Sequence, residues 1–177
     1  DMAMYGKTIG NGYALTAVVG KKSVMEAAQS TFISSTFWTE RIGPTAALAT
    51  LKEMERVKSW EVITENGRKM QEGWEYLANL HGLDITLAGI PALSTYSFNS
   101  IDALSYKTLI SQEMLKKGIL ASTNFYASTA HSNVEFEIYF NVLDEIFAKI
   151  SKCEAGDINT RDLIEGPICH SGFKRLN

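Results

Sequence analysis

A single lysine stands in a glycine-rich turn near the start of the chain. Lys7 follows a short apolar stretch, residues 1 to 5, and precedes Gly10 and Gly12. Glycines permit positive φ angles and a close approach of the backbone to a bound group. A lysine presented there as a free amine can form a Schiff base with a carbonyl compound. A surface lysine in a β-turn remains an alternative, because Gly-Lys followed by Gly-x-Gly is not a specific motif.

Three hydroxyl side chains lie in a polar and aromatic segment ahead of a predicted apolar helix. They are Ser35, Thr36 and Thr39. The helix is expected over residues 44 to 56, because Pro44 suits a first helical turn. A hydroxyl beside a backbone amide makes a good anion site. The same hydroxyls could instead cap the helix that follows.

Two other groups of polar residues are weaker candidates. Arg41 could bind a carboxylate in bidentate fashion, although an ion pair with Glu40 or Glu53 is the favoured interpretation. The neighbours Cys169 and His170 do not make a metal site, since structural zinc requires four ligands at suitable spacing. No metal is therefore predicted.

The hydrophobic pattern predicts how the rest of the chain is built. Apolar residues recur at helical spacing from Ser59 to Leu80, and alternating stretches beyond it predict strands. His131 is expected to cap the last long helix. In chain order, the expected elements are a strand over 1–5, a buried strand over 14–20, helices over 23–28, 44–56 and 59–80, strands over 85–88 and 93–98, a helix over 103–117, a strand over 119–121 and a helix over 133–152.

Composition narrows the class of protein. The formal net charge is -3 over 177 residues, so there is no basic surplus to neutralise the phosphates of a nucleic acid. The longest apolar stretch, residues 13 to 19, is too short to cross a bilayer. Cys153 and Cys169 suit neither a disulfide framework nor a metal motif. Free thiols in a reducing compartment, the cytoplasm, are therefore expected.

The residues around Lys7 resemble the active-site segment of class III pyridoxal-phosphate-dependent aminotransferases. That pattern is an aspartate, a short apolar strand, a Gly-Lys pair and a cluster of glycines, and residues 1 to 13 match it. The resemblance is good through residue 56, including Pro44–Leu51, and looser beyond. It points to the glutamate-1-semialdehyde aminomutase branch.

The resemblance implies roles for three residues. Lys7 would be the catalytic residue that holds pyridoxal 5'-phosphate (PLP) as a Schiff base and moves a proton between substrate and cofactor. Ser35 and Thr36 would bind the cofactor phosphate, usually that of the neighbouring subunit, with Thr36 the first choice. Thr39 competes, because the segment between Thr36 and Pro44 is longer than the aminomutase branch leads us to expect.

A fold class and a domain division also follow from the resemblance. The expected fold is α/β: the C-terminal part of an aspartate-aminotransferase-like large domain over residues 1–58, then a small α+β C-terminal domain over 59–154 and a tail over 155–177. The chain opens at Asp1 inside an apolar alternation, which leads us to expect a truncated or processed product. The family's upstream half would carry a glycine-rich phosphate cradle, an aromatic residue stacked on the cofactor ring, and an aspartate bonded to its pyridinium nitrogen.

The implied function is the transfer of an amino group from an amino donor to a keto or aldehyde acceptor by a homodimer. One alternative is an aminomutase of the glutamate-1-semialdehyde type, and another is a non-catalytic truncated module that folds and dimerises without cofactor. The 177 residues alone are expected not to turn over, because part of the site is missing. Residues 124–131 contain no arginine for an α-carboxylate, which leaves room for a substrate other than an α-amino acid.

Overall fold

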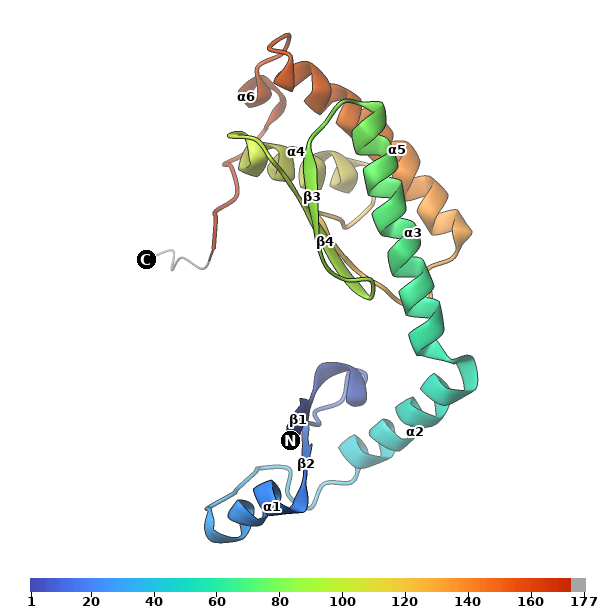
Figure 1. Ribbon diagram of the computed structural model, residues 1–177, viewed down its shortest axis with the longest axis vertical. Helices are drawn as coiled ribbons and strands as arrows, with labels where there is room; N and C mark the ends of the chain where they lie inside the picture. The colour runs from blue at the N-terminus through green and yellow to red at the C-terminus, as the bar shows by residue number, and fades with distance from the viewer. Residues whose placement is uncertain (173–177) are drawn as a thin grey trace. The chain divides into compact units, whose positions relative to one another are not determined.

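The computed structural model describes residues 1 to 172, in two compact units (Figure 1). The first unit is Asp1–Ser59, and the second unit begins at Trp60. Each unit has its own antiparallel sheet with helices. The basic end of the predicted tail, residues 173–177, lies outside the described residues.

The first unit is built on a hairpin of two short strands. β1 (Met2–Tyr5) pairs antiparallel with β2 (Ala17–Gly20), so that Tyr5 lies opposite Ala17. The remaining elements are η1 (Lys7–Ile9) after β1, and α1 (Lys22–Met25), η2 (Glu26–Ser30) and α2 (Ile42–Val57) after β2. The turn that holds Lys7 is therefore anchored on a strand, as predicted.

The prediction of a buried strand over residues 14–20 is wrong in two respects. The strand is shorter, and its central residues Val18 and Val19 are 48% and 49% exposed. A two-stranded hairpin is marginal by itself, because no further layer covers its faces. Every residue of β1 is exposed as well. The first unit thus has little core of its own.

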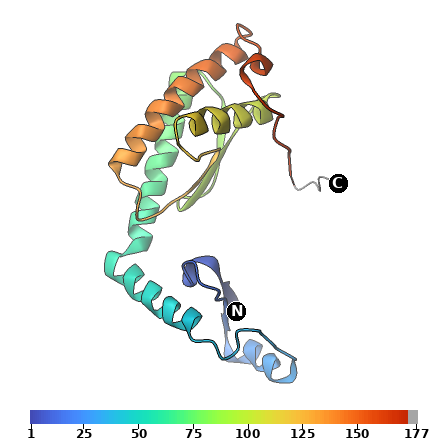
Figure 2. The ribbon, with the colours of Figure 1, turned by 180° about the vertical axis from the view of Figure 1, so that it is seen from behind.

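Helices cover one face of a three-stranded sheet in the second unit. The strands are β3 (Ile85–Ile90), β4 (Leu93–Phe98) and β5 (Asn124–Tyr126), in the order β3-β4-β5. The helices are α3 (Ser59–Leu80), α4 (Ala103–Lys116), α5 (Asn133–Glu154) and the short α6 (Thr160–Leu163). Figures 1 and 2 show α3 and α5 side by side from opposite directions.

An aromatic cluster fills the core of the second unit. The rings of Trp74 and Tyr96 lie 4.7 Å apart, and Tyr96 meets Phe98 and Phe147 edge to face. Such side chains bury a large apolar area each and gain further from this geometry. The cluster is therefore a main source of stability for the second unit.

Most of the predicted elements are confirmed, and α3 has the predicted bounds. The strand predicted over 119–121 is wrong, because those residues have no regular structure. The third strand is instead β5, in a segment without a predicted element. Three residues are too few to show an alternation of polar and apolar side chains, and β5 exists because it pairs with β4.

The segment predicted as a tail is bound to α4. The Gln112 side chain donates to the carbonyl of Leu163 (2.9 Å) and accepts from the backbone N–H of Glu165 (2.8 Å). The backbone N–H of Cys169 donates to the Thr108 hydroxyl (3.0 Å). These contacts make the residues around α6 part of the second unit.

Candidate functional site

Lys7 begins η1 where β1 ends, in an unusual backbone conformation. Its φ is 51°, in the left-handed region that residues with a Cβ seldom adopt. Its carbonyl accepts hydrogen bonds from the N–H groups of Gly10 (3.2 Å) and Asn11 (3.1 Å). Lys58 also has a positive φ, but it ends α2, where that conformation is usual. The strain at Lys7 has no such structural reason, and strain of this kind concentrates at functional sites.

Gly10 closes the turn that holds Lys7. It is buried, and a Cβ at this position would lie 2.1 Å from the carbonyl oxygen of Tyr13. No other residue fits there without a movement of the backbone. Asn11 and Gly12 continue the turn with φ values of 46° and 102°. The result is a tight turn with an exposed lysine side chain on it.

Ser35 and Thr36 lie in an exposed loop between η2 and α2. The Ser35 hydroxyl accepts a hydrogen bond from the backbone N–H of Phe37 (3.2 Å). Within residues 1–172, the hydroxyls of Thr36 and Thr39 have no hydrogen-bond partner. Both are therefore available for an anion.

Glu40 caps α2 in place of the hydroxyls. Its carboxylate accepts hydrogen bonds from the backbone N–H groups of Ile42 and Gly43, the second at 3.0 Å. The helix-capping interpretation of Ser35 and Thr36 is therefore wrong. A glutamate just before a helix is a less usual cap than serine or threonine, which is why the pattern did not predict it.

The ion pair favoured for Arg41 is also wrong. The Glu40 carboxylate already accepts hydrogen bonds from the first N–H groups of α2. Glu53 pairs with Arg56 through hydrogen bonds of 2.5 and 2.8 Å. The hydrogen bonds from Arg56 hold the pKa of Glu53 below its usual value. In the described part of the chain Arg41 forms no ion pair, and its side chain is exposed.

The structure does not bring Lys7 together with Ser35 and Thr36. Lys7 lies beyond the end of the hairpin where Tyr5 pairs with Ala17. The loop with the two hydroxyls follows α1 and η2, which leave the hairpin at its other end (Figure 1). Within one chain, the lysine and the hydroxyls are therefore separate sites.

Residues 1–172 also bear on a metal site, a disulfide and a membrane span. No cluster of histidine, cysteine, aspartate and glutamate there could hold a metal ion. Cys153 and Cys169 are both free. None of the helices in this range has the length and apolar character needed to span a membrane.

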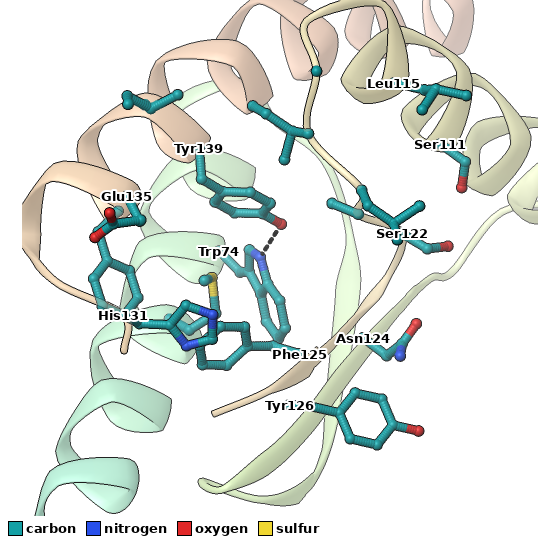
Figure 3. A pocket seen from close by; sticks show the side chains of 17 residues that line it. Trp74, Ser111, Leu115, Ser122, Asn124, Phe125, Tyr126, His131, Glu135 and Tyr139 are labelled. Carbon is teal, nitrogen blue, oxygen red and sulfur yellow. Dashed lines mark hydrogen bonds between the residues drawn. The ribbon is translucent and has the colours of Figure 1, made fainter. Parts of the chain in front are cut away.

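The second unit contains a pocket of about 760 Å³ that the sequence did not predict (Figure 3). His131 lines it, and the helix cap predicted for this residue is wrong: Ser132 is the N-cap of α5, in a capping box with Glu135. Tyr139 lines the pocket too and was missed. Its spacing of three residues from Phe136 on α5 was the signal that could have placed it inward.

No protein-family model matches the chain, but curated proteins do. The 3-aminobutyryl-CoA aminotransferase of Cloacimonas acidaminovorans is 26% identical over 158 residues, which cover 86% of this chain and 38% of that protein. A glutamate-1-semialdehyde 2,1-aminomutase of a Sulfurihydrogenibium species is 24% identical over 168 residues, covering 85% and 39%. The chain thus spans about two fifths of the length of these relatives.

Solved structures show the same relationship at the level of fold. The FumI protein of Sphingopyxis sp. MTA144, solved in its PLP internal aldimine form, superposes with a TM-score of 0.78 and 23% identity, covering 93% of this chain and 40% of that one. An omega-transaminase of Sphaerobacter thermophilus gives a TM-score of 0.74 at 16% identity, covering 86% and 39%. The predicted α/β fold class is confirmed. In sequence the chain is thus similar to aminotransferases and glutamate-1-semialdehyde aminomutases, and its fold is that of the matching part of solved transaminases.

Proposed function

We propose that Lys7 is the cofactor lysine of a PLP-dependent enzyme that transfers amino groups. The observation that carries the proposal is the left-handed backbone of Lys7, φ 51°, in a turn closed by Gly10. In this proposal residues 1–58 belong to the cofactor-binding large domain, and residues 59–154, with the segment around α6, form the small C-terminal domain.

The residues of the turn fit the cofactor. An exposed primary amine suits a covalent link to an aldehyde, and the glycines allow a flat ligand to approach the backbone. When bound, PLP supplies an electron sink for the carbanion formed at the substrate carbon. Lys7 would hold the cofactor covalently. After release, its amine would accept and return the proton at the substrate carbon.

Thr36 and Ser35 are proposed to bind the cofactor phosphate in a neighbouring subunit of a homodimer. Two observations support this: Thr36 has no hydrogen-bond partner within residues 1–172, and the hairpin separates it from Lys7 in its own chain. Phe37 and Trp38, 57% and 69% exposed, are proposed to lie at the two-fold interface.

The proposed reaction moves an amino group from a small amino donor to a keto or aldehyde acceptor. An aminomutase reaction is the alternative. The aminomutases among the relatives support it. A cytoplasmic location is part of the proposal, because both cysteines are free thiols.

Turnover by the 177 residues alone is not expected. The chain corresponds to 38–39% of the relatives' length, and no aspartate for the pyridinium nitrogen can be assigned in it. A non-catalytic module therefore remains the second candidate, and the small core of the first unit favours it. Transamination by the purified chain at rates typical of the family would contradict this part of the proposal.

Borohydride reduction in the presence of PLP tests the role of Lys7. Peptide mapping by mass spectrometry is expected to show the pyridoxyl adduct chiefly on Lys7, and Lys7→Arg is expected to abolish that adduct while keeping the positive charge. Lys22 is an exposed internal control, and Lys21 is a second one that pairs with Asp1 at 2.6 Å. Equal labelling of all three lysines would mean that Lys7 has no special role.

A further inference from the structure

The pocket in the second unit has a rigid aromatic floor. The indole N–H of Trp74 donates a hydrogen bond of 2.8 Å to the Tyr139 hydroxyl, and both side chains are buried. Phe136 is buried beside them. Figure 3 shows the Trp74–Tyr139 bond with His131 and Phe125 nearby. Because these rings are fixed by the core, the pocket does not depend on a ligand for its shape.

His131 presents one ring nitrogen without a partner. Its Nδ1 accepts a hydrogen bond from the backbone N–H of Ser128 (3.1 Å), so a neutral ring carries its proton on Nε2. The Asn66 amide fixes the loop by donating to the carbonyls of Ser128 and His131 (3.0 and 3.2 Å). Phe125 lies against the ring, with centroids 4.8 Å apart. Within residues 1–172 Nε2 makes no hydrogen bond, which leaves a positioned donor.

The lining of the pocket carries little charge. No lysine or arginine is among its described residues, and Glu135 is its one charged residue. The Glu135 carboxylate accepts two hydrogen bonds from Ser132, one from the backbone N–H (2.8 Å) and one from the hydroxyl (2.5 Å). An anionic ligand would lose its hydration here without gaining an opposite charge. A cation would gain little from Glu135, because this carboxylate is exposed to solvent and already hydrogen-bonded. A neutral ligand needs no opposite charge.

We propose that this pocket binds a neutral aromatic small molecule that carries a carbonyl or ether oxygen, and that His131 Nε2–H donates to that oxygen. The volume of about 760 Å³ lies in the range of small-molecule sites. The half-buried ring of Phe125 can contact an aromatic body, and the buried rings of Trp74 and Phe136 make the lining around it apolar. The site lies wholly in the second unit, so it requires neither Lys7 nor PLP.

The test is a fluorescence titration of the full chain, without PLP, with the probe 6-propionyl-2-(dimethylamino)naphthalene. This neutral aromatic ketone changes its emission with the polarity and hydrogen bonding of its surroundings. One saturable site per chain is expected. Ser122→Trp places an indole in the pocket and is expected to weaken binding at least about ten-fold by filling it. Ile101→Trp is the matched control, because Ile101 is fully exposed and outside the pocket, and it is expected to leave binding unchanged.

The role of His131 is tested by a second pair of variants. His131→Phe keeps a ring beside Phe125 but removes the donor, and it is expected to weaken binding about three- to ten-fold and to shift the bound emission to the blue. His131→Gln restores a donor and is expected to recover most of the affinity and the emission. Unfolding curves confirm that each variant is folded. No saturable binding, or equal binding by the Ser122→Trp and Ile101→Trp variants, would overturn the proposed site. An unchanged emission in His131→Phe would overturn the donor role.

Discussion

Trp74 and Tyr139 are joined by a buried hydrogen bond that ties α3 to α5. The indole N–H donates to the phenol oxygen at 2.8 Å, and the two residues are 65 positions apart in the sequence. Burial raises the pKa of Tyr139 well above its ordinary value, so the phenol stays neutral. The bond therefore does two things: it fixes the floor of the pocket, and it satisfies a donor that would otherwise be buried without a partner.

Tyr139→Phe is expected to destabilise the chain by about 1–3 kcal/mol, because it leaves the Trp74 N–H buried and unpaired. Urea unfolding followed by circular dichroism measures this. Tyr76→Phe is the control, since Tyr76 is an exposed residue of α3 and its loss of a hydroxyl is expected to cost almost nothing. Equal effects of the two substitutions would show that the buried bond contributes no stability.

Gly67 sets the distance between α3 and the turn that joins β3 to β4. A Cβ there would lie 1.8 Å from the carbonyl oxygen of Pro91. Alanine is normally the better helix residue by about 1 kcal/mol, yet Gly67→Ala is expected to destabilise by about 1–3 kcal/mol because backbone must move. A fall in the thermal midpoint checks this. Gly166→Ala, at a position with open space around it, is the control, and a rise in the midpoint for Gly67→Ala would contradict the packing.

The sequence predicted elements with strong periodicity and missed those that depend on distant partners. Met70, Trp74 and Leu77 follow helical spacing on α3, and all three are buried. β5 could not be predicted, because its three residues form a strand only through pairing with β4. The same reason applies to His131, whose position depends on a hydrogen bond from Ser128 and on the ring of Phe125.

The candidate site was predicted in part. The glycines around Lys7 predicted a tight turn, but only the structure shows that Lys7 itself has a positive φ. The loop with Thr36 was recognised, while the use of Glu40 as the cap of α2 was not. The apolar pattern of β2 suggested burial, yet its residues are exposed, because burial depends on a covering layer that a local pattern cannot reveal.

Glu113 of α4 accepts hydrogen bonds from Lys149 of α5 and from Lys116 of its own helix, both at 2.7 Å. Burial alone would raise its pKa, but hydrogen bonds from Lys116, Lys149 and Gln112 outweigh burial and hold the pKa at about 2. An unfolded glutamate titrates at about 4.3. The stabilising contribution of Glu113 is therefore present above about pH 4.3 and is lost as the pH falls toward about 2.

Glu113→Gln is expected to lower the free energy of unfolding by about 1–2 kcal/mol at pH 7, because it removes the charge that both lysines face. The difference from the unchanged protein should shrink steadily between about pH 4.5 and 2. Urea unfolding at a series of pH values measures it. Glu137→Gln, an exposed change on α5, is the control. A difference that stays constant from pH 7 to 2 would rule out the charged contribution.

The strained backbone at Lys7 predicts that its removal stabilises the hairpin. Lys7→Gly is expected to stabilise β1 and β2 by about 1 kcal/mol, since glycine adopts a φ of 51° without the penalty that a Cβ brings. Hydrogen exchange of the β1–β2 amides should slow about five-fold as a result. Lys7→Ala is the matched control, because it removes the amine and keeps the Cβ, and its exchange should stay near that of the unchanged protein. If both variants exchange alike, the strain is not located at this residue. If only glycine slows exchange, the chain keeps a lysine where glycine would be more stable, which is the expected signature of a residue retained for its amine.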